Sequence, residues 1–552
     1  MERTDWDAIV VGSGLGGLTA AAYLATNGLR TLVLEHHYVA GGNAHVFRRK
    51  ALRGKATFEF DVGVHYIGDC EPNGLFPSIL RGVGLEGKIE FVEMDPDGFD
   101  TMIFPGLTFR VPKGWDRYRE RLVAAFPDDE TGLHRCLDVL QQVIAEMRKM
   151  RLPVEPEDLP RLAQEAPTFL SWGMRPLQEL LDECNLGQKA RAVVTGEGGT
   201  YGVPPSRAPV IMHAAVLDHY LRSGAYYPKG GGQVLPAHLV DVVRSHGGEV
   251  RTRTRVERIL VRDGRAAGVR LASGDELSAR VVISNADLKR TVQELVGEEH
   301  FSQETVARVR QYRMALPLFC VYLGLDIDLR ERMPSTNYLY YTSFDIEGPY
   351  QDCYQGRVPS ELPVFITVAS VKDPDSETIA PKGYSSLEVM TVVPPDYRLW
   401  ALEEGPAGGE KYHRNPEYRS FKDELTDRLV EGAAQVIPEI RDHIVWKEAA
   451  SPITQERYTL STGGTSYGIE LACDQFGPNR PAPTTEIAGL YLAGASTVFG
   501  HGIAGVMRGG VGCASAVIGR DLFAEVASGR VFGDPTRLTG GGPGWDPWEA
   551  SR

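Results

Sequence analysis

Three glycines and a glutamate near the N-terminus have the types and spacing of a site that binds a dinucleotide. Gly12, Gly14 and Gly17 fit the pattern G-x-G-x-x-G. In such a site the first glycine permits a tight turn, the second lets a pyrophosphate approach the backbone, and the third lets a helix pack closely on a sheet. Glu35 follows, and its carboxylate can accept hydrogen bonds from a ribose diol while repelling a 2′-phosphate.

The hydrophobic pattern predicts the elements that must position these residues. The apolar run 8–11 predicts a buried strand, and residues 15–27 predict a helix that stops at Gly28. Residues 31–34 predict a second strand that ends on Glu35. A glycine turn alone often has only a backbone role, whereas this order of strand, glycines, helix, strand and acid favours phosphate binding at the helix N-terminus. Further expected cofactor contacts are Leu15, Gly16 and His36.

The composition indicates a soluble globular protein with more than one domain. The chain has 552 residues, 42% of them apolar and 24% charged, and is too long for a single core. A net charge of −14 disfavours nucleic acid as a partner. The 7 cysteines form no C-x-x-C pair, which argues for a reducing compartment and against a zinc or other metal site. With no signal peptide and no apolar run of membrane-spanning length, we expect a cytoplasmic protein that can associate with membranes.

Further glycine-containing motifs follow the second predicted strand. Gly41, Gly42 and Asn43 allow another close backbone approach, and residues 58–68, FEFDVGVHYIG, alternate like a strand and end in a glycine turn. Together with the N-terminal motif, these runs resemble the flavoprotein family of phytoene desaturases, carotenoid isomerases and retinol saturases. The His-Tyr pair within the second run looks closest to the retinol saturase branch. Similar runs occur in this family at residues 226–232, 281–287 and 464–470.

The resemblance extends over residues 5–525 and implies an α/β fold. It implies a Rossmann-like FAD-binding domain of the amine oxidase or phytoene desaturase type with an interleaved α+β substrate domain. The implied FAD-binding domain comprises residues 1–70, 225–297 and 452–530. The implied substrate-binding domain comprises residues 71–224 and 298–451. The composition of residues 531–552, which include a run of glycines, predicts a disordered tail.

Another motif, at residues 487–496, resembles the strand that closes the flavin site in this family. It ends on Gly494 and leads into a helix whose N-terminus would stabilise negative charge on the reduced flavin. Many relatives carry an acid directly after that glycine, where it binds the ribityl chain, but this chain has Ala495. Ribityl contacts must then come from backbone, water or Ser496, which leaves the strength of flavin binding open. The remaining expected cofactor contacts are Val256, Gly502, Ile503 and Ala504.

Four side chains are candidates for acid–base chemistry, because the resemblance makes their segments converge on the flavin. They are His65, Tyr66, Tyr467 and His501. Saturation of a double bond needs a hydride and a proton, desaturation needs the reverse, and isomerisation needs only transient addition or electron transfer. We favour Tyr66 as the proton donor with His65 as its support, whereas His501 is better suited to stabilise the reduced flavin.

Three functions remain open at this point. The resemblance favours FAD-dependent saturation, desaturation or cis–trans isomerisation of a long apolar polyene lipid, such as a carotenoid or retinoid. An amine-oxidase-type flavoenzyme on the same scaffold is the main alternative, and a lipid carrier similar to the GDP dissociation inhibitors is a third. A long apolar tunnel would favour the lipid, and two aromatic walls at the flavin would favour the amine.

The partners of the reaction are only partly predicted. A second G-x-G-x-x-G, at residues 82–87, lacks a preceding strand and a following helix, so it indicates a helix end and a turn. We therefore expect no separate NAD(P) site, and the electron donor or acceptor stays open. The expected substrate is a lipid-like small molecule taken from a membrane. The apolar segment 169–181 is our candidate entrance, with simple core packing as the alternative.

Overall fold

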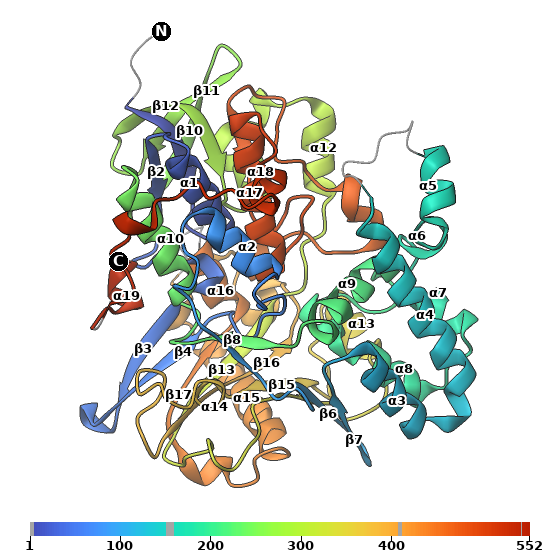
Figure 1. The fold of residues 1–552 in the computed structure, drawn as a ribbon. Coiled ribbons are helices and arrows are strands. Elements are labelled where there is room, and N and C mark those ends of the chain that lie inside the picture. The colour runs from blue at the N-terminus through green and yellow to red at the C-terminus, as the bar shows by residue number, and fades with distance from the viewer. Residues whose placement is uncertain (1–4, 151–158, 407–410, 543) are drawn as a thin grey trace.

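The computed structural model describes residues 5–150, 159–406, 411–542 and 544–552 (Figure 1). Two sheets of 7 strands each organise the chain and lie toward opposite ends of the molecule in Figure 1. The first sheet takes its strands from the start, the middle and the end of the chain. The second takes strands from two stretches that lie between those parts. The predicted α/β class with interleaved parts is therefore confirmed.

The first sheet, which we call the cofactor sheet, has the strand order β10-β11-β12-β1-β2-β9, with β18 beside β12. β1 pairs in parallel with β2 and with β12, and β12 pairs in parallel with β18. Parallel strands end at the same edge of a sheet, so the carboxyl ends of these four strands lie together. The strands are β1 (Trp6–Val11), β2 (Thr31–Leu34), β9 (Glu249–Arg251), β10 (Val256–Arg262), β11 (Arg265–Leu271), β12 (Glu276–Ser284) and β18 (Leu490–Leu492).

Glycines allow the helices beside the cofactor sheet to pack closely. α1 (Leu15–Thr26) contacts both α17 (Gly502–Ile518) and α10 (Val234–Ser245). A Cβ atom at Gly510 of α17 would lie 2.5 Å from the carbonyl oxygen of Gly16 in α1. A side chain there would force the two helices apart, so the close packing requires glycine. The predicted helix after the glycine motif and its two flanking strands are confirmed: the helix ends one residue earlier than predicted, the first strand starts two residues earlier, and the second strand has the predicted bounds.

The second sheet, which we call the substrate sheet after the predicted substrate-binding domain, has the order β17-β13-β16-β15-β14-β6-β7. β13 pairs antiparallel with both β16 and β17, and β16 is buried along its whole length. A long helix, α15 (Pro416–Ala434), covers one face of this sheet. The strands are β6 (Asp100–Phe104), β7 (Leu107–Val111), β13 (Leu318–Leu325), β14 (Asn337–Tyr340), β15 (Val364–Thr367), β16 (Ser385–Val392) and β17 (Ile444–Ala450).

A helical region lies beside β6 and β7, on the right of Figure 1. In α4 the buried residues Leu133, Leu137, Leu140 and Ile144 recur every three or four positions, as expected for a helix with one face in a core. No helix in the described part of the chain is both long and apolar enough to cross a membrane. The helices are α3 (Trp115–Ala125), α4 (Glu130–Met147), α5 (Leu159–Glu165), α6 (Pro167–Trp172), α7 (Leu177–Glu183), α8 (Gln188–Thr195) and α9 (Val210–Leu221).

A two-stranded arm connects the two sheets. β3 (Val46–Ala51) pairs antiparallel with β4 (Ala56–Asp61). Phe60 of β4 stacks on Trp446 of β17, with ring centroids 4.9 Å apart. The arm thus leads the chain from the cofactor sheet along the substrate sheet and directly into residues 62–68. A second pair, β5 (Phe91–Glu93) and β8 (Tyr226–Pro228), also runs antiparallel. The remaining helices include α2 (Leu75–Gly82), α11 (Leu288–Arg290), α12 (Gln303–Gln311), α13 (Gly348–Tyr354), α14 (Ala369–Lys372), α16 (Pro452–Thr459), α18 (Leu522–Ala527) and α19 (Pro547–Ala550).

Helix α2 shares a core with α1 and α17, because Phe76, Ile79 and Leu80 are buried in the same cluster. The predicted division placed this helix in the substrate domain, with residues 71–224, whereas it packs with two helices of the predicted FAD-binding domain.

α2 ends at Gly82, and Gly84 follows with a φ of +85° in a turn. The interpretation of the second glycine pattern as a helix end and turn is therefore confirmed.

The prediction of a disordered C-terminal tail is wrong for the described residues 531–542 and 544–552. The backbone N–H groups of Thr539 and Gly540 both donate to Asp241 of α10 at 2.9 Å. Asp546 accepts from the Arg48 guanidinium, at 2.8 Å for one of the two bonds. A glycine-rich composition gave the wrong signal because the scattered Asp and Trp residues of the segment find specific partners.

Candidate functional site

A cavity of about 360 Å³ lies where the parallel strands of the cofactor sheet end. Segments from the start, the middle and the end of the chain line it. The predicted cofactor residues that line it are Gly12, Gly14, Leu15, Gly16, Glu35, His36, Gly41, Gly42, Asn43, Val256, Gly494, Ala495, Gly502 and Ile503. Gly17 and Ala504 are not among the described lining residues. Of the catalytic candidates, His65, Tyr467 and His501 line the cavity and Tyr66 does not.

Asn285, just after β12, fills the space between the glycines. Its Nδ2 donates to the Gly12 carbonyl at 3.4 Å, and a Cβ atom at Gly14 would lie 2.9 Å from that nitrogen. A Cβ atom at Gly494 would lie 2.8 Å from the Asn285 Oδ1. This Oδ1 is buried and has no hydrogen-bond partner within the described residues, so it is an acceptor available to a ligand. Sequence reasoning noticed the run 281–287 only as a resemblance and missed this role.

Glu35 is buried at the end of β2 and held by three hydrogen bonds. Its Oε2 accepts from the backbone N–H and the hydroxyl of Ser13, at 2.9 and 2.7 Å. Its Oε1 accepts from the N–H of His37 at 2.8 Å. A carboxylate has about four acceptor positions, so Glu35 retains capacity for a ribose hydroxyl. The side chain is thus fixed in place before any ligand binds.

The second glycine motif lies against the first. Gly42 has a φ of +56°, and a Cβ atom there would lie 2.8 Å from Cα of Gly14. The amide of Asn43 bridges to the far side of the cavity, where Nδ2 donates to the Ser466 carbonyl at 3.1 Å and Oδ1 accepts from Gln455 at 2.6 Å. Asn43 therefore connects the glycine motif to residues 455–466 through its side chain.

His501 directly precedes α17 and presents a neutral imidazole. The enclosure of the ring, assisted by the charge of Arg480, lowers the pKa of His501 to about 4. Its Nε2 lies 3.2 Å from the carbonyl oxygen of Tyr201, which can only accept, so Nε2 carries the proton and Nδ1 is left as an acceptor. The ring of Tyr467 packs against it with a centroid distance of 4.5 Å. These two rings form one aromatic wall of the cavity.

The position after Gly494 is adapted to the missing acid. Ala495 lines the cavity with its methyl group, and its carbonyl accepts from Arg480 at 2.7 Å. The hydroxyl of Ser496 also lines the cavity and accepts from the N–H of Ile469 at 3.3 Å. A hydroxyl that accepts one bond still has its own proton to donate. Ser496 is therefore the described side chain that can replace the expected acid.

His65 and Tyr66 point to different surroundings. The His65 ring lines the cavity, and its Nδ1 is buried with no partner among the described residues. Burial lowers the pKa of His65 to about 3, so this ring is neutral. The Tyr66 hydroxyl donates to Glu197 at 3.4 Å, and its ring stacks on Tyr220 at 4.4 Å. The predicted support of Tyr66 by His65 is corrected accordingly, because Glu197 has that place.

A buried polar cluster lies behind this pair. The Lys372 Nζ donates to the His65 carbonyl at 2.6 Å and to Asn337 at 2.5 Å, and Asn337 donates to Asp100 at 2.8 Å. Burial raises the pKa of Asp100 to about 6. Burial, followed by the charge of Asp100, raises the pKa of Glu197 well above its usual range. Sequence reasoning missed the cluster, because its members come from distant segments with no shared motif.

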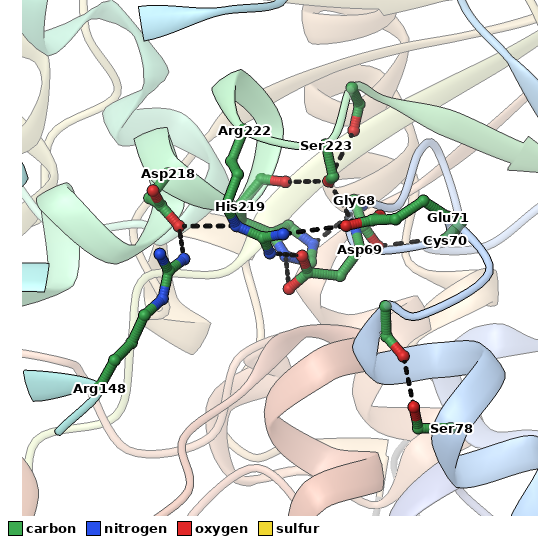
Figure 2. A network of polar contacts seen from close by, with 12 residues as sticks. Gly68, Asp69, Cys70, Glu71, Ser78, Arg148, Asp218, His219, Arg222 and Ser223 are labelled. Atoms are coloured by element: carbon green, nitrogen blue, oxygen red, sulfur yellow. Dashed lines mark hydrogen bonds and ion pairs between the residues drawn. The ribbon is translucent and has the colours of Figure 1, made fainter. Parts of the chain in front are cut away.

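A second polar network holds the loop after Tyr66 against α9 through hydrogen bonds and ion pairs, as Figure 2 shows. The Gly68 N–H donates to Nε2 of His219 at 2.9 Å, so the proton of this imidazole is on Nδ1, which lies 3.1 Å from Asp69. Arg222, also from the end of α9, contacts Asp69 and donates to Glu71 at 2.9 Å. Because α9 also carries Tyr220, this network fixes the stack of Tyr66 on that ring.

The far wall of the cavity is apolar. Leu318 and Cys320 of β13, Met390 of β16 and Ala450 of β17 line it. The Asp, Glu and Arg side chains among the described lining residues come from residues 35 and 255–294, on the side of the cofactor sheet. No described residue of the predicted entrance 169–181 lines this cavity. In that segment Leu177 is buried, whereas Leu170 is 45% and Met174 is 37% exposed.

Comparisons with known proteins show similarity in sequence and in fold. The sequence profile described as "Flavin containing amine oxidoreductase" matches residues 15–387. The chain is 30% identical to the all-trans-retinol 13,14-reductase of Macaca fascicularis, over 94% of this chain and 87% of that protein. It is 26% identical to prolycopene isomerase 1 of an Oncidium hybrid cultivar, over 94% of this chain and 84% of that protein. A structure of putrescine oxidase bound to putrescine has the same fold, with a TM-score of 0.61, 13% identity, and coverage of 93% of this chain and 99% of that one.

Proposed function

The chain belongs to the flavin-containing amine oxidoreductase family, and from this premise we propose that it reduces a carbon–carbon double bond of a long apolar polyene. It is a FAD-dependent oxidoreductase. The observation that carries the choice of substrate is the far wall of the cavity, where Leu318, Cys320, Met390 and Ala450 offer apolar surface. The names of the retinol reductase and prolycopene isomerase relatives support a polyene, and the higher identity to the reductase supports saturation.

The described residues fit FAD. Glu35 retains an acceptor position for the adenosine ribose, and Gly12 and Gly14 line the cavity with backbone that a pyrophosphate can approach. The buried Oδ1 of Asn285 lacks a partner in the described chain and can accept from the cofactor. The N-terminus of α17 and the Ser496 hydroxyl lie at the closing loop. When bound and reduced, FAD would supply a hydride, which carries both electrons for reduction of a double bond.

The cavity offers a candidate for the proton donor. Tyr467 lines the cavity, and its hydroxyl makes a single long bond, 3.4 Å, to the Gly199 carbonyl. A hydroxyl held this weakly can turn toward a substrate carbon. His65 and His501 are neutral and poor acids, and burial also raises the pKa of Tyr467, so the choice among the three rests on geometry. We therefore propose Tyr467 as the proton donor. Tyr66, whose hydroxyl donates to Glu197, lies behind the cavity wall and is the second candidate donor.

An amine substrate is the second candidate, because the fold is shared with putrescine oxidase and Tyr467 and His501 form one aromatic wall. An ammonium group would need a carboxylate or a second aromatic wall, and the described far wall has neither of these. This difference favours the polyene.

The test uses the purified, FAD-loaded protein. Photoreduced enzyme is mixed without oxygen with all-trans-retinol or with a poly-cis carotenoid, and flavin absorbance and product mass are followed. We expect flavin reoxidation and a product heavier by two hydrogens. An isomer of unchanged mass would assign isomerisation instead. Rapid bleaching of the oxidised flavin by putrescine, with no reaction of either polyene, would contradict the proposal.

We also propose a weak peripheral contact with membranes through α6 and the residues after it. Leu170 and Met174 are exposed there, and Arg175 lies over the Trp172 ring at 4.0 Å. Exposed apolar side chains beside a cation suit a lipid headgroup boundary. Replacing Leu170 and Met174 with Ser should reduce co-sedimentation with anionic liposomes and leave flavin content unchanged. Equal co-sedimentation of parent and variant would refute this contact.

A further inference from the structure

Arg480 is a buried arginine whose guanidinium contacts backbone carbonyls. The residue is 4% exposed. Its Nε donates to the carbonyl of Thr497 at 2.9 Å, and Nη2 donates to that of Ala495 at 2.7 Å. Nη1 reaches three further carbonyls at 3.2, 3.2 and 3.4 Å, those of Ile469, Glu470 and Gln475. In the described part of the chain, no carboxylate forms an ion pair with it.

A buried cation without an anion is expensive, so its retention needs a reason. Removing a guanidinium from water is offset only partly by carbonyl dipoles. Burial lowers the pKa of Arg480 to about 10, which still leaves it charged at neutral pH. A neutral side chain could satisfy some of the same carbonyls at lower cost. The positive charge itself is therefore the feature to explain.

The charge lies behind the loop that closes the flavin site. Two of its five acceptors, Ala495 and Thr497, belong to this loop, and Ala495 lines the cavity. The charge also reaches His501, where it lowers the pKa of the imidazole in addition to the larger effect of enclosure. The N-terminus of α17 begins at the next residue and is positive as well. Two sources of positive potential thus converge on one loop, and Ala495 supplies no carboxylate to offset them.

We infer that Arg480 is a positioning residue that fixes the loop 494–497 and, through its charge, makes the bound flavin easier to reduce. The negative charge that develops on a reduced flavin is stabilised by a nearby fixed cation. This inference rests on FAD as the cofactor of the proposed function and not on the polyene substrate. FAD-loaded protein that fails to reduce a polyene would contradict the proposed function and leave the role of Arg480 intact.

The test measures the flavin midpoint potential of the parent and three variants by equilibration with reference dyes. Arg480→Gln keeps some hydrogen bonds without the charge, and Arg480→Lys keeps the charge with fewer hydrogen bonds. Arg244→Gln is the matched control, because Arg244 donates to the Ala550 carbonyl at 2.8 Å and does not line the cavity. Binding of FAD is titrated for each variant, which separates loop position from charge.

For Arg480→Gln we expect at least a tenfold fall in the ratio of reduced to oxidised flavin at fixed potential, which is about 30 mV for a two-electron couple. Arg480→Lys should stay within threefold of the parent in this ratio while binding FAD more weakly, and Arg244→Gln should match the parent. An unchanged potential in Arg480→Gln would overturn the inference. So would an equal fall in Arg480→Lys. If Arg480→Gln does not fold, Arg480→Lys decides alone, because a tenfold fall contradicts the role of the charge and a retained potential supports it.

Discussion

The two walls of the cavity are built in different ways. The cofactor wall includes backbone at glycines, the buried carboxylate of Glu35 and the amides of Asn43 and Asn285, and most of the expected cofactor contacts that line it lie within residues 11–45. The far wall consists of apolar side chains from β13, β16 and β17, which meet only because these strands pair across long stretches of sequence. The comparison teaches that the glycine-rich wall is encoded mostly by neighbouring residues, whereas the far wall depends on the completed fold.

The largest effect is expected from a substitution in the cofactor wall. Glu35→Ala removes a carboxylate that holds Ser13 and His37 and that can accept from the ribose. Each lost bond to a charged group is worth about 1.5–3 kcal/mol, so FAD affinity should fall by about 10- to 1000-fold. Flavin retention is measured by absorbance after gel filtration, with Glu35→Gln as the variant that keeps the shape. Tight retention of FAD by Glu35→Ala would show that the ribose lies elsewhere.

The next largest effect is expected from a substitution that changes the far wall and leaves the cofactor wall intact. Met390 of β16 is 5% exposed and lines the cavity. Met390→Glu places a carboxylate in apolar surroundings, so reduction of all-trans-retinol should fall more than 100-fold while FAD stays bound, since burying such a charge costs several kcal/mol. Met390→Leu is the matched control. The separation of the two walls is refuted if flavin and retinol activity are lost together in Met390→Glu in a folded protein.

The local geometry around the glycine motif could be predicted from the sequence for a physical reason. The turn at Gly12, the close approach at Gly14 and the carboxylate of Glu35 each follow from neighbouring residues. Asn285 was missed because its position between the glycines results from the pairing of β1 with β12. The C-terminal segment was mispredicted because composition does not reveal that Asp546 meets Arg48.

The catalytic candidates were predicted only in part. His65, Tyr467 and His501 line the cavity, as the resemblance implied. The partner of Tyr66 was wrong, since Glu197 lies in a glycine-rich turn far along the chain and no motif points to it. Lys372 and Asp100 likewise come from the substrate sheet and its adjoining helix, and only the three-dimensional structure brings them together.

A smaller effect is expected from removing single tyrosine hydroxyls near the boundary between the two walls. Tyr467→Phe removes the proposed proton donor and should slow reduction of retinol about 100-fold, without loss of FAD. Tyr66→Phe removes a hydroxyl that does not line the cavity, so it should slow the same step less than tenfold. Both rates are read from flavin reoxidation in stopped flow. A larger loss in Tyr66→Phe than in Tyr467→Phe would return the donor role to Tyr66.

The smallest effect concerns stability behind the far wall. The pKa of Asp100 is raised in the folded protein, from 3.8 to about 6, so the carboxyl destabilises the fold as the pH rises through this interval. Asp100→Asn should therefore be no more stable than the parent below pH 4 and gain on the order of 1–3 kcal/mol relative to it above pH 6. Urea unfolding at both pH values measures this gain, and Asp263→Asn, at an exposed turn, is the control. A gain of the same size at both pH values would show that titration of the Asp100 carboxyl is not its source.

The central claim is that the two walls together reduce a double bond with FAD electrons and a proton from this chain. The most direct measurement is a single turnover of photoreduced, FAD-loaded enzyme with all-trans-retinol, run in parallel in H2O and D2O, with the product analysed by mass. The account predicts a product heavier by two hydrogens in H2O and carrying at least one solvent deuterium in D2O, and a slower turnover in Tyr467→Phe. A product of unchanged mass and without deuterium, differing only in double-bond geometry, would contradict it.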